Sequence, residues 1–438
     1  MKLLEQLGLG RRDLRAWALY DWANSAYQTT IIAAVFPVYY ANVVAAGLDD
    51  AEATSRFAWA TTIAVVIVAV VAPLLGAIAD YAAVKKRMLA AFMGVGVVST
   101  AAMYWVDRGD VSLGLLLFVI GNVGVAGSIV FYESLLPHLV DEHELDRVSS
   151  AGYAIGYLGG GVLLAINVVM LQNPGLFGLP DRVAAVKASF VTVGIWWLVF
   201  SLPLFRSVPE PPRAIEKDER AGGNALAVGF RRLIETFQEL RRYKHAFLML
   251  IAFLIYNDGI QTMIRMAAMY GSSIGIDETA LITALLITQF IGVPFAFLFG
   301  HVAGKLGAKP SVFLGLAVYA FICAVGYFMT TAAHFYILAM LVGMVQGGTQ
   351  ALSRSMFASM IPRHKSSEFF AFFGVFERYA GVLGPLIFAM MVTATGSSRN
   401  AILAVLGFFI VGGAILTFVD VDDGRQAARA AEANVTRV

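Results

Sequence analysis

The chain has 438 residues, of which 59% are hydrophobic and only 14% are charged, and its mean hydropathy is +0.73. Soluble domains carry about 25% charged residues, so this composition indicates a membrane protein. The net charge of +2 and the lack of a basic stripe argue against a nucleic-acid partner, and the single cysteine, Cys323, excludes a disulfide framework within the chain.

The N-terminal residues 1–16 lack the apolar segment and the cleavage site of a signal peptide, so we expect them to form a retained cytosolic tail. A transmembrane helix needs about 20 mostly apolar residues. On that criterion the chain predicts an all-α membrane protein with twelve transmembrane helices, at residues 17–43, 55–79, 87–106, 112–139, 149–171, 184–205, 244–271, 279–300, 310–331, 334–358, 367–392 and 400–420.

One long polar stretch, residues 207–243, divides the predicted helices into two sets of six. We expect an N-terminal six-helix bundle over residues 17–206, a C-terminal bundle over residues 244–420, and a cytosolic tail at residues 421–438. Within the linker, residues 226–240 place their apolar side chains on one helical face, with arginines on the others. This pattern predicts an amphipathic helix that either tethers the linker at the membrane interface or serves as a regulatory site.

Lysine and arginine are distributed unevenly between the loops on the two sides of the predicted membrane. One side carries the basic residues of the N-terminal tail, the linker and a cluster at residues 85–87. The other side carries only Arg56, Arg108, Arg182, Lys187 and Arg399. Because cytosolic loops are enriched in lysine and arginine, we expect a multi-pass protein of the cell (inner or plasma) membrane with both termini in the cytosol.

The two halves of the chain repeat one another at an offset of 224 or 225 residues, or of 233 for the first helix, where a longer loop at residues 48–56 accounts for the difference. The matching features are Gly76-x-x-x-Asp80 with Gly300-x-x-x-Gly304, Pro137 with Pro362, Gly159-Gly160 with Gly384-Pro385, and Asn24-x-x-x-Gln28-Thr29 with Asn257-x-x-x-Gln261-Thr262. Two parallel repeats of six helices predict the major facilitator fold, in which the substrate binds between the halves near the middle of the bilayer.

Ionisable side chains inside transmembrane helices cost about 2.5–3.5 kcal/mol each on insertion scales, so each calls for an interior role. We consider the carboxylates Asp21, Glu133, Asp258 and Glu377 as candidates for proton coupling. Asp21 and Glu133 lie near predicted cytosolic helix ends, where solvation alone is an alternative. The arginines inside the predicted helices of the second half are Arg265, Arg354 and Arg378, and we expect Arg354 or Arg378 to receive an anionic group of the substrate. The alternative is that these charges pair within the second half and hold that bundle together.

Uncharged polar side chains recur at helical spacing beside these charges, so they share faces of their helices. The candidate substrate-binding residues are Asn24, Tyr27, Gln28, Asn122 and Tyr157 in the first half, and Asn257, Gln261, Gln346, Gln350, Arg354 and Arg378 in the second. An uncharged face opposite a charged one would suit a zwitterionic solute. Tyr153, Phe372 and Phe373 would equally suit an aromatic or amphipathic one.

Enzyme signatures do not occur in the chain. It has no nucleotide-binding GxxxxGK[ST] motif, no HExxH motif and no serine nucleophile elbow, and its histidines lack metal-ligand spacing. We therefore expect a protein that is not an enzyme and that carries no cofactor and no resident metal.

The turn after the second predicted helix resembles the signature loop of the major facilitator superfamily. Its residues here are Gly76, Asp80, Lys85, Lys86 and Arg87. In the superfamily this loop latches the cytosolic helix ends in one of two states, so the resemblance implies the same latch for these residues. The loop departs from the usual pattern at Ala83 and Val84, and the second copy has Gly304 in place of the aspartate.

Four longer strings are similar to the vacuole-effluxer family, also called the unknown major facilitator family. They are WALYDWANSAY from Trp17, RVSSAGYAIGYLGGG from Arg147, YNDGIQT from Tyr256 and QGGTQALSRSMFASMIP from Gln346. Fungal members of that family are associated with export of amino acids from the vacuole. The resemblance implies a monomeric secondary transporter of an amino acid or related metabolite, with efflux favoured over uptake and protons as a possible coupling ion.

Two alternatives stay open at this point. The cargo could belong to another class, such as a sugar, a drug or a lipid-like amphiphile. The protein could also be a membrane scaffold or sensor that transports nothing, although a scaffold gives no reason for the charges inside the helices.

Overall fold

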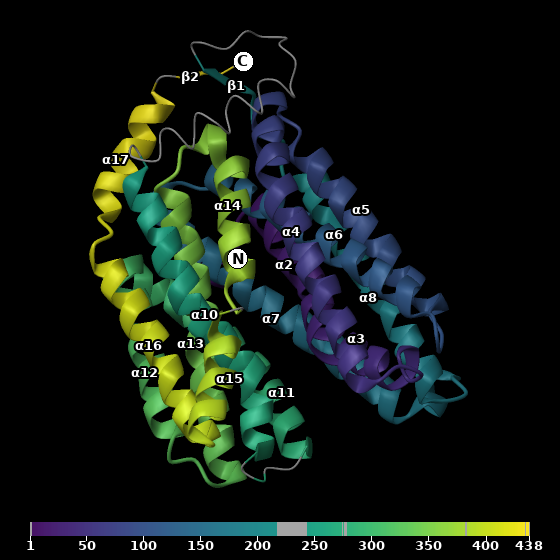
Figure 1. Ribbon diagram of the computed structural model, residues 1–438. Helices are drawn as coiled ribbons and strands as arrows, with labels where there is room; N and C mark the ends of the chain where they lie inside the picture. The colour runs from purple at the N-terminus through teal and green to yellow at the C-terminus, as the bar shows by residue number, and fades with distance from the viewer. Residues whose placement is uncertain are drawn as a thin grey trace.

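The computed structural model describes residues 2–216, 243–273, 275, 278–381, 383–433 and 435–437, and these residues form two helical bundles (Figure 1). The amphipathic helix predicted at residues 226–240 lies outside this described part. The helices before the linker form the N bundle, and helices α10 to α16 after it form the C bundle.

The N bundle is built from α1 (Lys2–Gln6), α2 (Arg12–Ala26), η1 (Tyr27–Val35), α3 (Phe36–Tyr39), η2 (Tyr40–Val44), α4 (Asp50–Ala82), α5 (Lys85–Ala102), η3 (Met103–Trp105), α6 (Val111–Leu139), α7 (Glu142–Gln172), η4 (Pro174–Phe177) and α8 (Arg182–Ser207). Helix α2 packs against α7 and α8, and α5 packs against α6. Glycines permit the closest approaches: a Cβ on Gly124 of α6 would lie 2.6 Å from the backbone of Gly96 in α5.

The C bundle is built from α10 (Lys244–Ser273), α11 (Glu278–Leu306), α12 (Ala308–Gly326), α13 (Ala332–Ser359), η6 (Arg363–Lys365), α14 (Ser366–Tyr379), α15 (Leu383–Thr395) and α16 (Ser398–Thr417). Helix α11 packs against α13, and α10 packs against α16. Large apolar side chains such as Phe328 of the C bundle and Val70 of the N bundle stay exposed on the outside, as a lipid-facing surface requires.

Eleven helices in the described residues are long and apolar enough to cross a membrane. The remaining predicted helix, residues 17–43, is helical too, but it is divided into α2, η1, α3 and η2. Segments η1 and η2 are π-helical, and Pro37 in α3 lacks the N–H that would continue the α-helical ladder. The prediction of one regular helix was wrong here, because apolar periodicity does not report local changes of pitch.

Two further helix predictions need correction. The fifth transmembrane helix begins at Glu142 rather than at residue 149, because the acidic run before it forms the first turn, where negative charge is favourable. The helix predicted at residues 367–392 is broken into α14 and α15. At the break, Gly381 adopts φ +92°, a left-handed conformation that interrupts an α-helix.

The two bundles contact each other through two pairs of interfaces. Helix α14 of the C bundle packs against α4 and α6, and α7 of the N bundle packs against α11 and α13. Figure 1 shows the bundles converging at one end and diverging toward the other. We call the converging end, which carries the C-terminus of α4 and the N-terminus of α14, the closed end.

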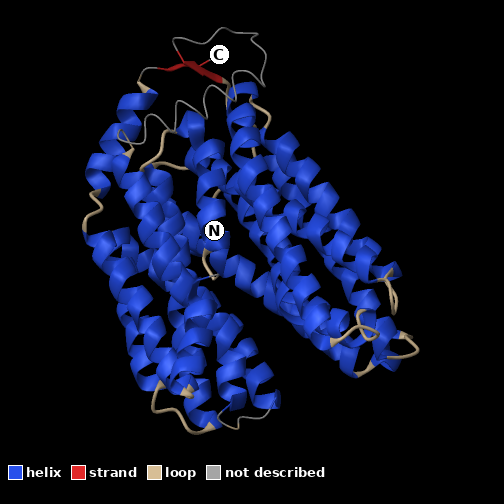
Figure 2. Cartoon of the chain, viewed as in Figure 1, coloured by secondary structure: helices blue, strands red, loops and turns tan. Residues whose placement is uncertain are grey.

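The predicted C-terminal tail contributes a helix and a strand to the closed end. Helix α17 (Val421–Glu432) is capped by Asp420, the residue before it. The Asp420 carboxylate accepts hydrogen bonds from the N–H groups of Asp422 and Asp423, each at 3.1 Å, and these bonds lower the pKa of Asp420. Strand β2 (Val435–Arg437) then pairs antiparallel with β1 (Ala214–Glu216), which follows α8 (Figure 2). The end of the chain is thereby joined to the segment that leaves the N bundle.

Candidate functional site

Arg354 of α13 crosses from the C bundle into the N bundle, and its side chain is buried there. Its Nε donates to Ser149 Oγ at 2.9 Å, and its Nη2 donates to the Ser149 carbonyl oxygen at 2.9 Å. Ser149 Oγ in turn donates to the carbonyl oxygen of Ala351, 2.7 Å away. Helices α7 and α13 are therefore joined by a guanidinium and a hydroxyl that both find their partners across the bundle boundary.

Two carboxylates of the N bundle face the same guanidinium. Arg354 Nη1 lies 3.5 Å from Asp21 Oδ2 and 3.6 Å from Glu133 Oε1. The Tyr132 hydroxyl donates to Asp21 Oδ2 at 2.7 Å and fixes that carboxylate. The alternative in which the charges pair only within the second half is therefore wrong for Arg354, which pairs with residues of the first half.

Aromatic rings complete the surroundings of the guanidinium. The Arg354 Cζ atom lies 4.5 Å from the ring centre of Tyr153, 5.1 Å from that of Trp17 and 5.9 Å from that of Tyr132. A cation is attracted to the face of an aromatic ring within about 6 Å, and more strongly when water is excluded. Carboxylates, hydrogen-bond acceptors and aromatic rings of the N bundle thus surround the positive charge that Arg354 carries.

Glu133 is compensated less completely than Asp21. The Glu133 residue is only 3% exposed, so the alternative in which water alone solvates this carboxylate does not hold. Its Oε1 has Arg354 at 3.6 Å, whereas Oε2 has no hydrogen-bond partner within the described residues. A buried carboxylate oxygen without a partner favours the protonated, neutral form.

The charges around this position do not balance. Glu377 and Arg378 occupy the last turn of α14, and both side chains are partly buried. Asp21, Glu133 and Glu377 supply three carboxylates, while Arg354 and Arg378 supply two cations. One proton on a carboxylate would neutralise this group.

Asp258 has a separate set of partners. Its residue is 1% exposed, and its carboxylate accepts hydrogen bonds from the backbone N–H groups of Gly381, Leu383 and Gly384 at 2.8, 3.2 and 2.8 Å. Asp258 therefore caps the N-terminus of α15.

The neutral polar residues of the second half come together in part. Gln350 Nε2 donates to Asn257 Oδ1 at 3.5 Å, and Asn257 Nδ2 is buried with no hydrogen-bond partner among the described residues. Gln261 and Gln346 are half-buried on the same two helices. These four side chains follow α10 and α13, as their spacing predicted. Arg265 has no described side chain.

The candidates of the first half are more dispersed. Asn24 and Asn122 each donate to a carbonyl of their own helix, at Tyr20 and Phe118. The Tyr27 ring packs 5.7 Å from Trp197 inside the N bundle. Gln28 is half-buried on η1, and a Cβ on Gly347 of α13 would lie 2.5 Å from the ring of Tyr157. Of this set, Tyr157 lies directly against α13 of the C bundle.

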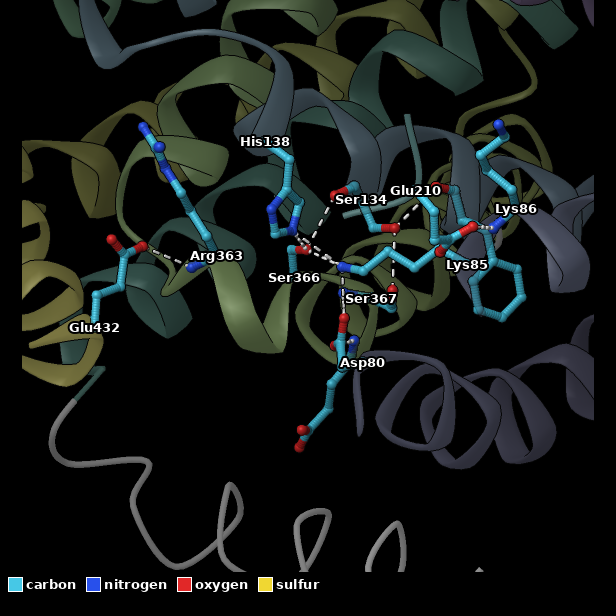
Figure 3. A network of polar contacts seen from close by, with 12 residues as sticks. Asp80, Lys85, Lys86, Ser134, His138, Glu210, Arg363, Ser366, Ser367 and Glu432 are labelled. Carbon is cyan, nitrogen blue, oxygen red and sulfur yellow. Dashed lines mark hydrogen bonds and ion pairs between the residues drawn. The ribbon is translucent and has the colours of Figure 1, made fainter. Parts of the chain in front are cut away.

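The predicted latch residues form a polar network at the closed end (Figure 3). Asp80 Oδ1 pairs with Lys85 Nζ at 2.6 Å, and both side chains are buried. The same carboxylate accepts the backbone N–H groups of Ser367 and Glu368 at 3.2 and 3.0 Å, which caps α14 from the other bundle. A Cβ on Gly76 would lie 2.6 Å from the Ser367 carbonyl oxygen, so glycine is required for this approach.

Serine and histidine side chains extend this network. Lys85 Nζ donates to Ser366 Oγ at 2.6 Å and lies 3.2 Å from His138 Nε2. Ser366 Oγ donates to the Ser134 carbonyl oxygen at 3.0 Å, and the Oγ atoms of Ser134 and Ser367 are 3.1 Å apart. Ser134, Ser366 and Ser367 were not among the predicted site residues. The pair Ser366 and Ser367, with Glu368 directly after it, is nevertheless typical of a helix N-terminus.

The other two latch candidates lie outside this ion pair. Lys86 Nζ donates to the carbonyl oxygens of Phe205 and Val208 at the end of α8, at 3.0 and 2.5 Å. Its backbone N–H donates to the carboxylate of Glu210, whose pKa is raised by burial. Arg87 is exposed. Lys86, which lies on α5, therefore holds both the end of α8 and the start of the linker against α5.

Comparison with known protein families gives one match over most of the chain. The profile of a family described as "Vacuole effluxer Atg22 like" matches residues 10–429. An uncharacterized MFS-type transporter, YxiO of Bacillus subtilis (strain 168), is 36% identical over 406 residues, which cover 92% of this chain and 94% of that protein. Autophagy-related protein 22 of Kluyveromyces lactis is 24% identical over 375 residues, which cover 79% of this chain and 75% of that protein.

Solved structures show the same fold at low sequence identity. The MFS proton:xylose symporter XylE, bound to 6-bromo-6-deoxy-D-glucose, superposes with a TM-score of 0.70 at 14% identity, covering 98% of both chains. At that identity the likeness confirms the predicted major facilitator fold.

Proposed function

Because the chain belongs to the Atg22-like vacuole effluxer family and has the major facilitator fold, we propose that it is a secondary active transporter of an amino acid or related metabolite. Transport of a solute across a membrane follows from its transporter relatives. Alternating access, proton coupling and efflux are the further parts of the proposal. The observation that carries it is Arg354, a C-bundle cation held by two N-bundle carboxylates, one of which has an unpartnered oxygen.

The geometry supports a coupling between protons and the position of the bundles. While the closed end stays closed, Arg354 compensates the charges of Asp21 and Glu133. When the bundles separate there, Arg354 withdraws and leaves two carboxylates in a region of low dielectric. Protonation of Glu133 lowers the energy of that separated state, because a neutral carboxyl needs no counter-ion. A proton bound at Glu133 therefore favours opening of the closed end.

The substrate part of the proposal rests on the family and on polar side chains. Amino acids carry a carboxylate and an ammonium group, and the last turn of α14 offers Arg378 beside Glu377. Asn257, whose Nδ2 is buried without a partner in the described chain, supplies a further donor. A buried donor of this kind is costly unless a bound molecule satisfies it.

Orientation and location complete the proposal. The closed end carries Lys85, Lys86 and Lys365, and we place it in the cytosol on the strength of the positive-inside rule. We place the protein in the cell membrane as a monomer, with both termini on the cytosolic side.

The test is uptake of a labelled amino-acid panel into proteoliposomes, with and without an imposed proton gradient. We expect one class of amino acid to accumulate only with the gradient. In Glu133→Gln, gradient-driven uptake should fall at least about tenfold while exchange of labelled for unlabelled solute continues, because exchange needs no net proton movement. Glu52→Gln, which changes an exposed carboxylate paired with Arg56, is the matched control.

Two results would contradict the proposal separately. A panel in which no amino acid moves under either condition would show that the substrate class is wrong. A Glu133→Gln variant that keeps the wild-type gradient dependence would move the coupling site away from Glu133.

A further inference from the structure

The break in the eleventh transmembrane helix divides it between different neighbours. Helix α14 packs against α4 and α6 of the N bundle and against α10, whereas α15 packs against α16 and α10 of its own bundle. Figure 1 shows α14 and α15 following one another along the molecule. The break therefore lies where a segment at the bundle interface passes into a segment that belongs to the C bundle alone.

Asp258 holds one side of this break to α10. Its Oδ1 accepts the N–H groups of Gly381 and Gly384, and its Oδ2 accepts that of Leu383. The first N–H groups of a helix have no partners within the helix and carry partial positive charge. The Asp258 carboxylate satisfies two such donors of α15, at Leu383 and Gly384, together with the N–H of Gly381 just before the helix.

On the other side of the break, the described residues show no side-chain cap at the end of α14. Its final turn carries Glu377 and Arg378. The N–H of Ala380 donates to the Phe376 carbonyl oxygen at 3.0 Å, and Gly381 then turns the chain. A glycine at positive φ is a position where the backbone direction can change at low steric cost. Movement of α14 about this point therefore moves Glu377 and Arg378 with it.

We propose that Asp258 is a positioning residue, which anchors the start of α15 to α10 so that α14 swings about Gly381 when the closed end opens. The inference rests on the alternating-access function proposed above. It separates Asp258 from the coupling carboxylates: Asp258 keeps its hydrogen bonds to the start of α15 throughout, and sets where Glu377 and Arg378 lie.

The first experiment measures hydrogen exchange of the full-length protein in nanodiscs, without any solute. In Asp258→Ala we expect the amides of Gly381, Leu383 and Gly384 to exchange about tenfold faster, the change that loss of an ordinary helix cap produces. The amides of Ser367 and Glu368, which Asp80 caps, should keep their protection. Thr393→Val, which removes an exposed hydroxyl bonded to the Ala389 carbonyl oxygen of α15 at 2.9 Å, away from the break, is the matched control.

A second experiment compares Asp258→Asn with Asp258→Ala in the proteoliposome assay, using the labelled amino-acid panel. An asparagine oxygen still accepts the two hydrogen bonds made by Oδ1, so Asp258→Asn should keep several times more activity than Asp258→Ala. Gradient-driven uptake and exchange should fall in parallel in each variant. Gly384→Ala provides a further variant, because its Cβ would lie 1.7 Å from Thr262 Oγ1 and 2.8 Å from Asp258 Oδ1.

The outcomes are distinguishable from failure of the transport proposal. Unchanged hydrogen exchange at the amides of Gly381, Leu383 and Gly384 in both Asp258→Ala and Gly384→Ala would overturn the anchoring role. Loss of gradient-driven uptake alone in Asp258→Asn, with solute exchange intact, would overturn it in favour of proton carriage. If the wild-type protein moves no amino acid, the transport proposal fails while the hydrogen-exchange result still decides the anchor.

Discussion

The two halves of the repeat meet at the closed end in two interfaces that ought to be equivalent but differ in chemistry. At the interface of α4 with α14, the polar interface, Asp80 caps the opposite helix and pairs with Lys85. At the interface of α11 with α7, the glycine interface, Gly304 stands where Asp80 stands in the first copy. There, a Cβ on Gly300 would lie 2.7 Å from Ser150 Cβ.

This difference assigns the two interfaces separate tasks. Buried ion pairs and helix caps are either made or broken, so the polar interface has two discrete states. Close packing between small residues changes little when one helix slides along another. The ion pair of Arg363 with Asp141, which precedes α7, lies at the surface, where a pair contributes about 0–1 kcal/mol. We therefore expect the polar interface to open in the transport cycle and the glycine interface to persist as a pivot.

Cross-linking the polar interface is the change with the largest expected effect. The Oγ atoms of Ser134 and Ser367 are 3.1 Å apart, so cysteines at both positions can form a disulfide in a Cys323→Ala background. Oxidised Ser134→Cys/Ser367→Cys protein should lose at least about tenfold in gradient-driven uptake, and a reductant should restore it. The single cysteine variants serve as controls. Full uptake by completely cross-linked protein would mean that this interface need not open.

Removing one partner of the Asp80–Lys85 pair should have the next largest effect. Loss of one partner from a buried pair costs about 3–5 kcal/mol, because the remaining charge is buried alone. Asp80→Asn and Lys85→Met should each shift the protein toward the state with the closed end open, measured as a distance distribution between spin labels on the two bundles. The double variant should lie closer to wild type than the sum of the two effects, and strict additivity would argue against the pair.

Substituting alanine at the equivalent glycines, Gly76 and Gly300, should distinguish the two interfaces by whether a second substitution can relieve the clash. Gly76→Ala places its Cβ 2.6 Å from the Ser367 carbonyl oxygen. This is a backbone atom, so no substitution of the Ser367 side chain can remove the clash. Gly300→Ala meets the side chain of Ser150, so Ser150→Gly should rescue it. We expect each alanine to cost about 1–3 kcal/mol in thermal unfolding, with rescue only at the glycine interface. Failure of that rescue would show that the pivot does not depend on this contact.

Much of the fold followed from sequence because helix length, loop charge and the repeat are long-range patterns. The break at Gly381 did not, since one glycine in an apolar run does not reveal its backbone angle. The partners of Asp258 could not be predicted either, because they are backbone N–H groups of a helix more than 120 residues away.

The site shows the same limit. Sequence spacing placed Asn257 and Gln350 on polar faces that do meet, since helical periodicity fixes a face. It could not show that Arg354 leaves its own bundle for Asp21 and Glu133, because the rotation and depth of each helix are set by packing between bundles. Residues such as Ser149 were missed because a serine in a transmembrane helix is common and usually bonds its own backbone.

The smallest expected effect comes from giving the glycine interface the missing carboxylate. Gly304 is exposed, and a Cβ there has no atom within 4 Å, so Gly304→Asp should fold normally. The first turn of α7 carries two acidic residues, Glu142 and Glu144, whereas that of α14 carries one, Glu368, and the Asp80 that caps α14 is paired with Lys85. Repulsion between like charges prevents a second cap from forming. The free-energy difference between the open and closed states, measured from the spin-label distance distribution, should therefore change by less than about 0.5 kcal/mol. Stronger closure in Gly304→Asp would contradict the assignment of a pivot, because it would show that either interface can serve as the latch once it carries an aspartate.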